Sequence, residues 1–513
     1  MDSLTPYPRR WWSLGVLCVG LLVISVDNTI VNVALPTLAR VLSAGTSELQ
    51  WIVDAYILVF GGLLITAGNL GDRIGRRRML LIGCAIVAAG SLATLLVSSA
   101  AQLIVIRAVM GVGGACIMPT TLSVVTNIFP DDERPRAIAV WAGVAGLGLV
   151  IGPVTGGWLL EHAHWSSVFL INVPVAVFVG AAALLVVPET RDPHPGPLDP
   201  VGAALSIGGL AALLYGIIEA PTRGWDNPAT LAWTAAGCLG LVAFIAWEMR
   251  SRAPMLDVRL FLRPRFGVAS LAMTLDMFAS LGTLFFATQY LQFVLGYSPL
   301  EAGLALLPVA AGVLIGAALS SRLLARTGAK LPVAGGLLVM AVALWLISGA
   351  RVDSPYAFLG TLAGVVGIGG GLAMTPATDS IMGAVPKARA GVGSAMNDTT
   401  RQVGGALGVA VLGSVLSSGY QAAIGGPLQG LPPAIADPAR GSIGAAAVVA
   451  TQVGGPAGQL LLAAARSAFV DGMATSAQVG ALVMVTAALL ALFLLPARAP
   501  EQQAERPGRP IAA

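Results

Sequence analysis

Apolar runs of about 20 residues recur along the whole chain, and this repetition limits the possible fold more than any other feature. A helix of that length crosses a bilayer core of about 30 Å. The runs are continuous rather than alternating, which favours helices over a β-barrel. The sequence therefore predicts an all-α polytopic membrane protein. We expect fourteen spans, at residues 12–36, 49–70, 79–98, 101–126, 137–160, 166–187, 201–219, 228–247, 267–294, 299–321, 331–349, 356–378, 395–418 and 472–496.

Composition excludes several alternative classes of protein. Only 11% of the 513 residues are charged, too few to keep a soluble chain of this length dissolved. The first run is not a cleavable signal peptide, because it is too long, carries Asp27 and lacks a small-residue cleavage site. The four cysteines fall in different spans with no paired spacing, so we expect neither a disulfide nor a metal site.

Basic residues are distributed unevenly between the two sides of the membrane. With the N-terminus inside, 22 Lys and Arg residues fall in cytoplasmic segments and five fall outside. This asymmetry follows the positive-inside rule and predicts an even number of helices with both termini cytoplasmic. Anchoring of the topology explains Arg77 and Arg78 in "GDRIGRRRML", residues 71–80, so a nucleic-acid-binding patch is not needed to account for them. It does not explain Asp72.

Two polar breaks divide the chain. A Pro-rich segment, 188–200, follows six spans, and a basic segment, 248–266, follows two more. Arg73-x-Gly75 recurs faintly as Arg326-x-Gly328, which is typical of transporters built from two similar halves. We predict an N-terminal six-helix bundle (1–187), a linker with two additional transmembrane helices (188–266), a C-terminal six-helix bundle (267–496) and a cytoplasmic tail (497–513). Within the second bundle we expect one long external loop, 419–470, with a short surface helix at 458–470.

Charged side chains inside the spans are the main functional candidates, because each costs about 2.5–3.5 kcal/mol to insert. Counting along the spans places Asp27, Asp54 and Arg107 in the outer half of the bilayer. Two acids and one base at similar depth predict a proton and cation site. Alternatively, Asp54 and Arg107 form a static pair.

In the second half, Asp276 lies near mid-depth with no basic residue at that depth, so it is a candidate to bind a proton or the substrate. The alternative is a carboxyl group hydrogen-bonded to a neighbouring hydroxyl. Asp398 and Arg401 lie near cytoplasmic helix ends, where we interpret them as gate or capping residues.

Several motifs resemble the major facilitator superfamily. "GNLGDRIGRRRML" (68–80) is similar to its cytoplasmic loop motif, "LIVIRAVMGVGGACIMP" (103–119) to its fourth-helix motif, and "GLVIGPVTGGWL" (148–159) to its antiporter motif. "VDNTIVNVALPTL" (26–38), "WIVDAY" (51–56) and "NDTTRQVGGALGVAV" (397–411) resemble the fourteen-helix drug:proton antiporter branch, the multidrug and quaternary-ammonium exporter type. The resemblance covers essentially the entire chain.

This resemblance assigns roles to particular residues. It implies a cytoplasmic gate of Gly68, Asp72, Arg73, Gly75 and Arg76, to which we add Asp398 and Arg401 from the second half. Asp72 and its neighbouring arginines would form ion pairs between the halves and break them as the halves rock. The antiporter motif comprises Gly148, Gly152, Pro153, Gly156 and Gly157, and the resemblance implies that it seals the substrate cavity. Ordinary small-residue helix packing explains the same glycines.

The sequence thus predicts a proton-coupled antiporter of the plasma (inner) membrane that exports amphipathic, often cationic, drugs or toxic compounds by alternating access. The alternative is a dedicated exporter of one endogenous metabolite, antibiotic or lipid. An ATP-driven pump would need a phosphate-binding loop, but neither Lys330 nor Lys387 lies in one. His162, His164 and His194 form no catalytic cluster, so we expect no enzyme. We expect protons, small-molecule substrates and lipid as partners of a monomer, with no nucleic acid, cofactor or metal.

Overall fold

The computed structural model describes residues 7–130, 132–192, 198–251, 254–385, 390–429 and 432–496. These described residues form helices and turns without a strand. Fourteen of their helices are long and apolar enough to cross a membrane, as the sequence predicts. The fold class, an all-α polytopic membrane protein, is therefore confirmed.

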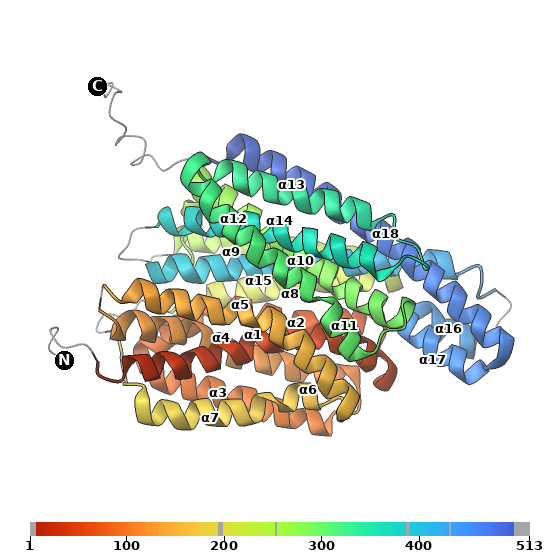
Figure 1. Ribbon diagram of the computed structural model, residues 1–513, viewed down its shortest axis with the longest axis horizontal. Helices are drawn as coiled ribbons and strands as arrows, with labels where there is room; N and C mark the ends of the chain where they lie inside the picture. The colour runs from red at the N-terminus through yellow and green to blue at the C-terminus, as the bar shows by residue number, and fades with distance from the viewer. Residues whose placement is uncertain are drawn as a thin grey trace.

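The first group of helices packs together in the lower part of Figure 1. Within it, α2 packs on α4, α1 on α5, and α3 on both α4 and α7. The predicted span 166–187 is divided into a short helix and a longer one. The group comprises α1 (Arg10–Val41), α2 (Thr46–Ile74), α3 (Arg76–Ala93) with the 3-10 turn η1 (Thr94–Leu96), α4 (Ala100–Ile128), α5 (Arg134–His162), α6 (Ser167–Leu170) and α7 (Asn172–Val186).

Along the chain, two helices stand between this group and the second one. They are α8 (Pro200–Arg223) and α9 (Pro228–Arg250), and they pack on each other through glycines. A Cβ atom at Gly209 would lie 2.9 Å from the backbone nitrogen of Leu241, so only glycine allows this approach. Helix α8 also contacts α2 and α15, one helix from each group, and α9 packs against α8.

The second group lies in the upper part of Figure 1. Here α12 packs on α14, α10 on α15, and α13 on both α14 and α18. The group comprises the 3-10 turn η2 (Val258–Leu262), α10 (Pro264–Gln289) with its π-helical extension η3 (Tyr290–Val294), α11 (Pro299–Ala305), α12 (Leu307–Thr327), α13 (Lys330–Ile347), α14 (Tyr356–Gly383), α15 (Ala390–Ile424), α16 (Pro433–Gly441), α17 (Ile443–Val453) and α18 (Gly455–Leu494).

Residues 419–470 differ from the predicted external loop. The described part of this segment is mostly helical: α15 continues to Ile424, α16 and α17 form a hairpin, and α18 begins at Gly455. Gly454 and Gly455 have φ values of 64° and 57°, which turn the chain between α17 and α18. Residues 458–470 belong to the first turns of α18 and are not a separate surface helix. Alanine and leucine dominate this stretch, and both favour a continuous helix.

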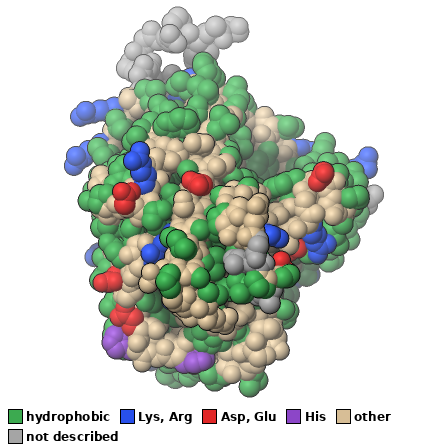
Figure 2. Space-filling model, turned by 90° about the vertical axis from the view of Figure 1, so that its right-hand side faces the viewer, with side chains coloured by type: hydrophobic (Ala, Val, Ile, Leu, Met, Phe, Trp, Pro, Cys, Tyr) green, Lys and Arg blue, Asp and Glu red, His purple; other side chains and the backbone are tan. Residues whose placement is uncertain are grey.

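The two ends of the molecule differ. Helix α1 begins and α18 ends at one end, on the left of Figure 1, which we call the terminal end. The α16–α17 hairpin lies at the opposite end, which we call the hairpin end. Figure 2 views the hairpin end and shows acidic and basic side chains interspersed among apolar ones. The charge rule predicts that the terminal end is cytoplasmic.

Candidate functional site

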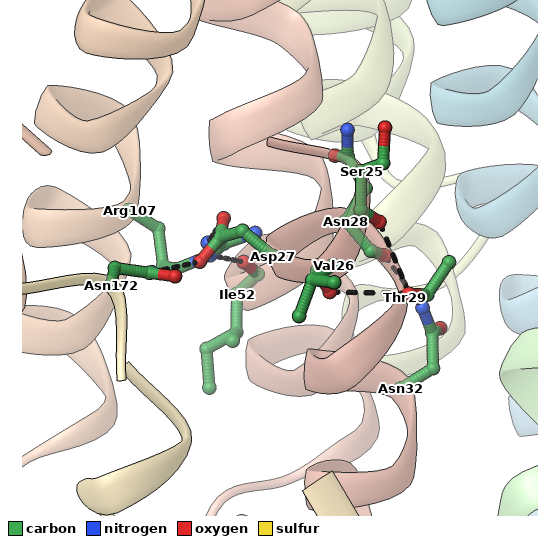
Figure 3. A network of polar contacts seen from close by, with 9 residues as sticks. All are labelled: Ser25, Val26, Asp27, Asn28, Thr29, Asn32, Ile52, Arg107 and Asn172. Atoms are coloured by element: carbon green, nitrogen blue, oxygen red, sulfur yellow. Dashed lines mark hydrogen bonds and ion pairs between the residues drawn. The ribbon is translucent and has the colours of Figure 1, made fainter. Parts of the chain in front are cut away.

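A buried ion pair lies inside the first group. Arg107 of α4 places Nη1 2.5 Å from Oδ2 of Asp27 of α1, and both side chains are at most 2% exposed. Asn172, at the start of α7, donates its Nδ2 to the other oxygen of Asp27 at 2.9 Å. Arg107 also donates Nε to the carbonyl of Ile52, 3.1 Å away, and its guanidinium lies 4.3 Å from the ring centre of Tyr56. Figure 3 shows the ion pair within this network.

This network satisfies both carboxylate oxygens of Asp27 and links four helices, α1, α2, α4 and α7. Removing one member of such a buried pair typically costs about 3–5 kcal/mol, because the other charge is left buried without a partner. The sequence analysis identified Asp27 and Arg107 but missed Asn172. An amide within an otherwise apolar span, next to the break after α6, is the signal that could have found it.

Asp54 lies apart from this pair. The sequence grouped Asp54 with Asp27 and Arg107 by depth, and the structure joins only the latter two. Residues Ile52 and Tyr56 face Arg107, and a residue two positions away points to nearly the opposite side of a helix. Asp54 is fully buried, and neither of its oxygens has a hydrogen-bond partner among the described residues.

The helix face that carries Asp54 points across the boundary between the groups. Gln50, one turn before it, and Gly61, two turns after it, both contact α15 of the second group. Positions 50, 54 and 61 share one side of α2. Asp54 therefore belongs to the interface between the two groups and not to the interior of the first.

Asp276 is the corresponding lone acid of the second group. It lies on α10, is 1% exposed, and neither of its oxygens has a partner among the described residues. A Cβ atom at Gly370 of α14 would lie 3.4 Å from its Oδ1, so the carboxylate faces a glycine. The predicted alternative, a hydrogen bond to a neighbouring hydroxyl, is not among the interactions of the described residues.

The loop motif at the terminal end is held within the first group. Asp72 of α2 pairs with Arg76 of α3 at 2.8 Å, four residues later. Gly75 adopts φ = 113°, which favours glycine, and the carboxylate of Glu189 occupies the position that a side chain there would need. Gly68 lies against Pro119 of α4, and the exposed Arg73 lies in the last turn of α2.

A segment that the sequence analysis missed braces this loop. Glu189 accepts the backbone N–H of Arg77 at 3.1 Å, and the backbone N–H of Asp192 donates to the carbonyl of Asp72 at 3.0 Å. The linker after α7 thus runs beside the motif. In the second group, Asp398 and Arg401 pair with each other at 3.8 Å on α15. Asp72 contacts Arg76 of α3 and the segment that follows α7, so in this conformation the terminal-end loop is held on the first group.

The glycine motif of α5 has two faces. Gly148, Gly152 and Gly156 pack directly on Ser25, Thr29 and Ile30 of α1, and Thr29 donates its hydroxyl to the carbonyl of Gly148 at 2.9 Å. Gly157 contacts the second group instead, because a Cβ there would lie 2.5 Å from the carbonyl oxygen of Pro299. Pro153 faces Gly303 of α11 in the same way. The motif therefore packs closely within its group and also meets the other group at the hairpin end.

The fold agrees with the comparisons with known proteins. The profile of the Major Facilitator Superfamily matches residues 17–409. The chain belongs to this superfamily. It is 38% identical over 481 residues to the multidrug efflux pump LfrA of Mycolicibacterium smegmatis, covering 94% of this chain and 95% of the relative.

Other relatives show the same correspondence. The tetracenomycin C resistance and export protein of Streptomyces glaucescens is 35% identical, covering 96% of this chain and 94% of the relative. The methyl viologen resistance protein SmvA of Salmonella typhimurium is 33% identical, and the match covers 90% of this chain and 93% of the relative. A bacterial homologue of the human lysosomal transporter Spinster shares the fold, with a TM-score of 0.67 at 20% identity over 96% of this chain and 100% of that one. This superfamily member is a multi-pass protein of the plasma membrane.

Proposed function

We propose that the protein exports amphipathic, often cationic, drug-like molecules in exchange for protons. The main observation in support is that Asp54 and Asp276 are buried carboxylates whose oxygens have no hydrogen-bond partner among the described residues. A lone charge inside a membrane protein is costly unless something positive joins it. A proton and a cationic substrate are the two partners that an antiporter exchanges. The names of the relatives, which are drug efflux and resistance proteins, support the same substrate class.

Exchange follows if one carboxylate binds either a proton or the positive charge of the substrate. Protons arriving from outside then displace substrate, and loss of the proton inside allows the next substrate to bind. We propose that the first and second groups rock about this region, opening the terminal end to the cytoplasm and the hairpin end to the exterior in turn. The proton gradient supplies the energy, so the proposed cycle requires no cofactor.

Reconstitution tests this proposal directly. Purified protein in proteoliposomes should transport several chemically different cationic dyes when a pH gradient is imposed, and transport should stop when an ionophore removes the gradient. Asp54→Asn and Asp276→Asn should each reduce the transport, whereas Asp471→Asn, at an exposed position of α18, should not. Transport of one compound only, or transport that ignores the gradient, would contradict the proposal.

A further inference from the structure

Two buried glutamines join the two groups of helices at the hairpin end, one contributed by each group. Gln50 of α2 donates its Nε2 to the carbonyls of Val409 and Ala410 of α15, both at 2.9 Å. Gln292 of η3 donates its Nε2 to the carbonyl of Val33 of α1, also at 2.9 Å. The first glutamine is fully buried and the second is 8% exposed. Each amide therefore crosses the interface in the opposite direction to the other.

A glycine leaves room for the amide of Gln50, and Gln292 lies in an irregular helical segment. Gly413 lies opposite Gln50, and a Cβ atom there would lie only 2.6 Å from the glutamine nitrogen. Gln292 lies in the π-helical segment η3, and π turns inside helices are frequent at functional sites. Its acceptor Val33 packs in a small apolar cluster with Leu291, Ala302 and Leu306 of the second group.

Helix α8 is fastened to the same junction. Ser414 of α15 donates its hydroxyl to the carbonyl of Ile217 at 2.9 Å, and Ser47 of α2 donates to the carbonyl of Ile218 at 3.1 Å. Ser414 also lies 3.4 Å from the Nε2 of Gln50. One of the two additional helices thus bridges both groups beside one of the glutamines.

Each of these amides leaves one polar atom unsatisfied at the interface. The Oε1 atoms of Gln50 and Gln292 are both buried without a partner among the described residues. The unsatisfied oxygen limits the net stability that each amide gives the closed interface, but removing the amide N–H would leave the carbonyls opposite it buried without that donor. Such an amide suits an interface that must open, because water satisfies both the glutamine and the released carbonyls once the groups separate.

We propose that Gln50 and Gln292 are reversible latches that hold the hairpin end closed and set how often it opens. The inference rests on the alternating access of the proposed function, in which the hairpin end must open once in each cycle. Their hydrogen bonds exist only when the groups meet. Losing one therefore raises the population of the conformation that is open at the hairpin end without touching the buried acids.

The chain supplies a matched control for these residues. Gln289 precedes Gln292 by three positions and is 1% exposed, but its Nε2 donates to the carbonyl of Phe285 in its own helix, at 3.1 Å. Gln→Met keeps the length of the side chain and removes the donor. Gln50→Met and Gln292→Met should open the hairpin end, and Gln289→Met should not.

Opening is measured without transport, by labelling a buried cysteine. Ala302→Cys places a thiol in the closed apolar cluster, in a background whose four native cysteines are replaced. A membrane-impermeant maleimide is added separately to intact cells and to inverted vesicles, which also establishes on which side the hairpin end lies. Each latch variant should raise the labelling rate about two- to ten-fold, the range expected for one neutral hydrogen bond. The double variant should approach the product of the two increases.

Labelling of the latch variants at the rate of Gln289→Met would overturn the proposal, as would an equal increase in all three variants. If Gln50→Met does not yield a monodisperse protein, Gly413→Ala tests the same latch from the opposite side, because the added methyl group displaces the amide. It should also raise labelling. Dye export by the wild-type protein is measured in parallel: its absence would contradict the proposed function, whereas the labelling comparison tests the latches alone.

Discussion

Asp27 and Asp54 lie on neighbouring helices and are equally buried, yet only Asp27 has a basic partner. This difference follows from helix geometry, because Asp54 points away from the face of α2 that meets Arg107. An ion pair is neutral overall, whereas a lone carboxylate in the membrane needs a proton or a cation. The two acids therefore lie in different chemical environments.

Asp27→Asn should abolish gradient-driven export while the protein remains in the membrane. The variant leaves Arg107 buried beside an amide, so we also expect a destabilisation of about 3–5 kcal/mol. Dye efflux from proteoliposomes and the melting temperature of the purified protein measure the two effects. Asp471→Asn, at an exposed position, serves as the control. Efflux at the wild-type rate would remove Asp27 from the mechanism.

Asp54→Asn and Asp276→Asn should each reduce the transport of dicationic substrates more than that of monocationic substrates. Transport of neutral substrates should fall least. Each variant removes one negative charge from the interior, and a dication interacts with that charge twice as strongly. Loss of one charge-assisted contact predicts about a ten-fold larger decrease for dications. Transport rates of matched dyes in the three charge classes test this order. Equal losses in all classes would indicate a shared proton role or a folding defect.

At the scale of helices, hydropathy predicted all fourteen spans because each must cover the bilayer with apolar side chains. It did not predict that α18 starts at Gly455, since the added turns lie beyond the apolar stretch that the bilayer requires. It also missed Asn172, Glu189 and the two latch glutamines. Their roles depend on which distant helix lies opposite, and periodicity within one segment carries no such information.

The loop between α2 and α3 gives a prediction at this scale. Asp72→Asn should shift the resting population toward the conformation open at the terminal end if Asp72, which in this conformation pairs with Arg76 of its own group, pairs with the second group when that end closes. Labelling of Ala67→Cys in inside-out vesicles should rise about two- to five-fold, as expected for a partly exposed ion pair. Arg77→Gln should change little. Unchanged labelling and export in Asp72→Asn would reduce the loop to a topology anchor.

A second pair ties α1 to the segment before α5. Arg10 binds Glu133 through two contacts, 2.7 and 2.8 Å, and holds the pKa of Glu133 below its ordinary value of 4.5. A lowered folded-state pKa stabilises the protein above pH 4.5, and this contribution is lost as pH falls through the folded pKa. Glu133→Gln should lower the melting temperature slightly at pH 7. The difference from wild type should shrink below pH 4.5, and a difference that grew there would contradict this assignment.

At the scale of the whole molecule, the two groups meet at the hairpin end through α5 with α11, α2 with α15, and α1 with η3. Backbones approach closely at the first of these contacts, where Gly157 meets Pro299 and Gly303 meets Pro153. The approach requires glycine, since a side chain at either position would overlap the opposite carbonyl. Closure of this end thus depends on missing side chains as well as on hydrogen bonds.

Gly157→Val should therefore disfavour the conformation closed at the hairpin end. Overpacking of this kind costs about 1–3 kcal/mol, which corresponds to about a 5- to 150-fold change in the ratio of closed to open protein. Dye export should fall accordingly. Gly143→Val on the same helix is the matched control, because a Cβ atom there would meet no described residue within 4 Å outside its own stretch of helix. Similar losses in both variants would show that α5 tolerates no valine and would remove the contact with Pro299 as the cause.

Helix α18 is 40 residues long, about 60 Å at 1.5 Å per residue, which is twice the thickness of the bilayer core of about 30 Å. Together with α16 and α17 it extends past the other helices at the hairpin end (Figure 1). Most of this protein is hidden by lipid or detergent and offers little contrast for aligning particle images. Among the described residues, the projecting end of α18 marks one side of the membrane. An antibody fragment raised against it would serve as a fiducial for cryo-electron microscopy.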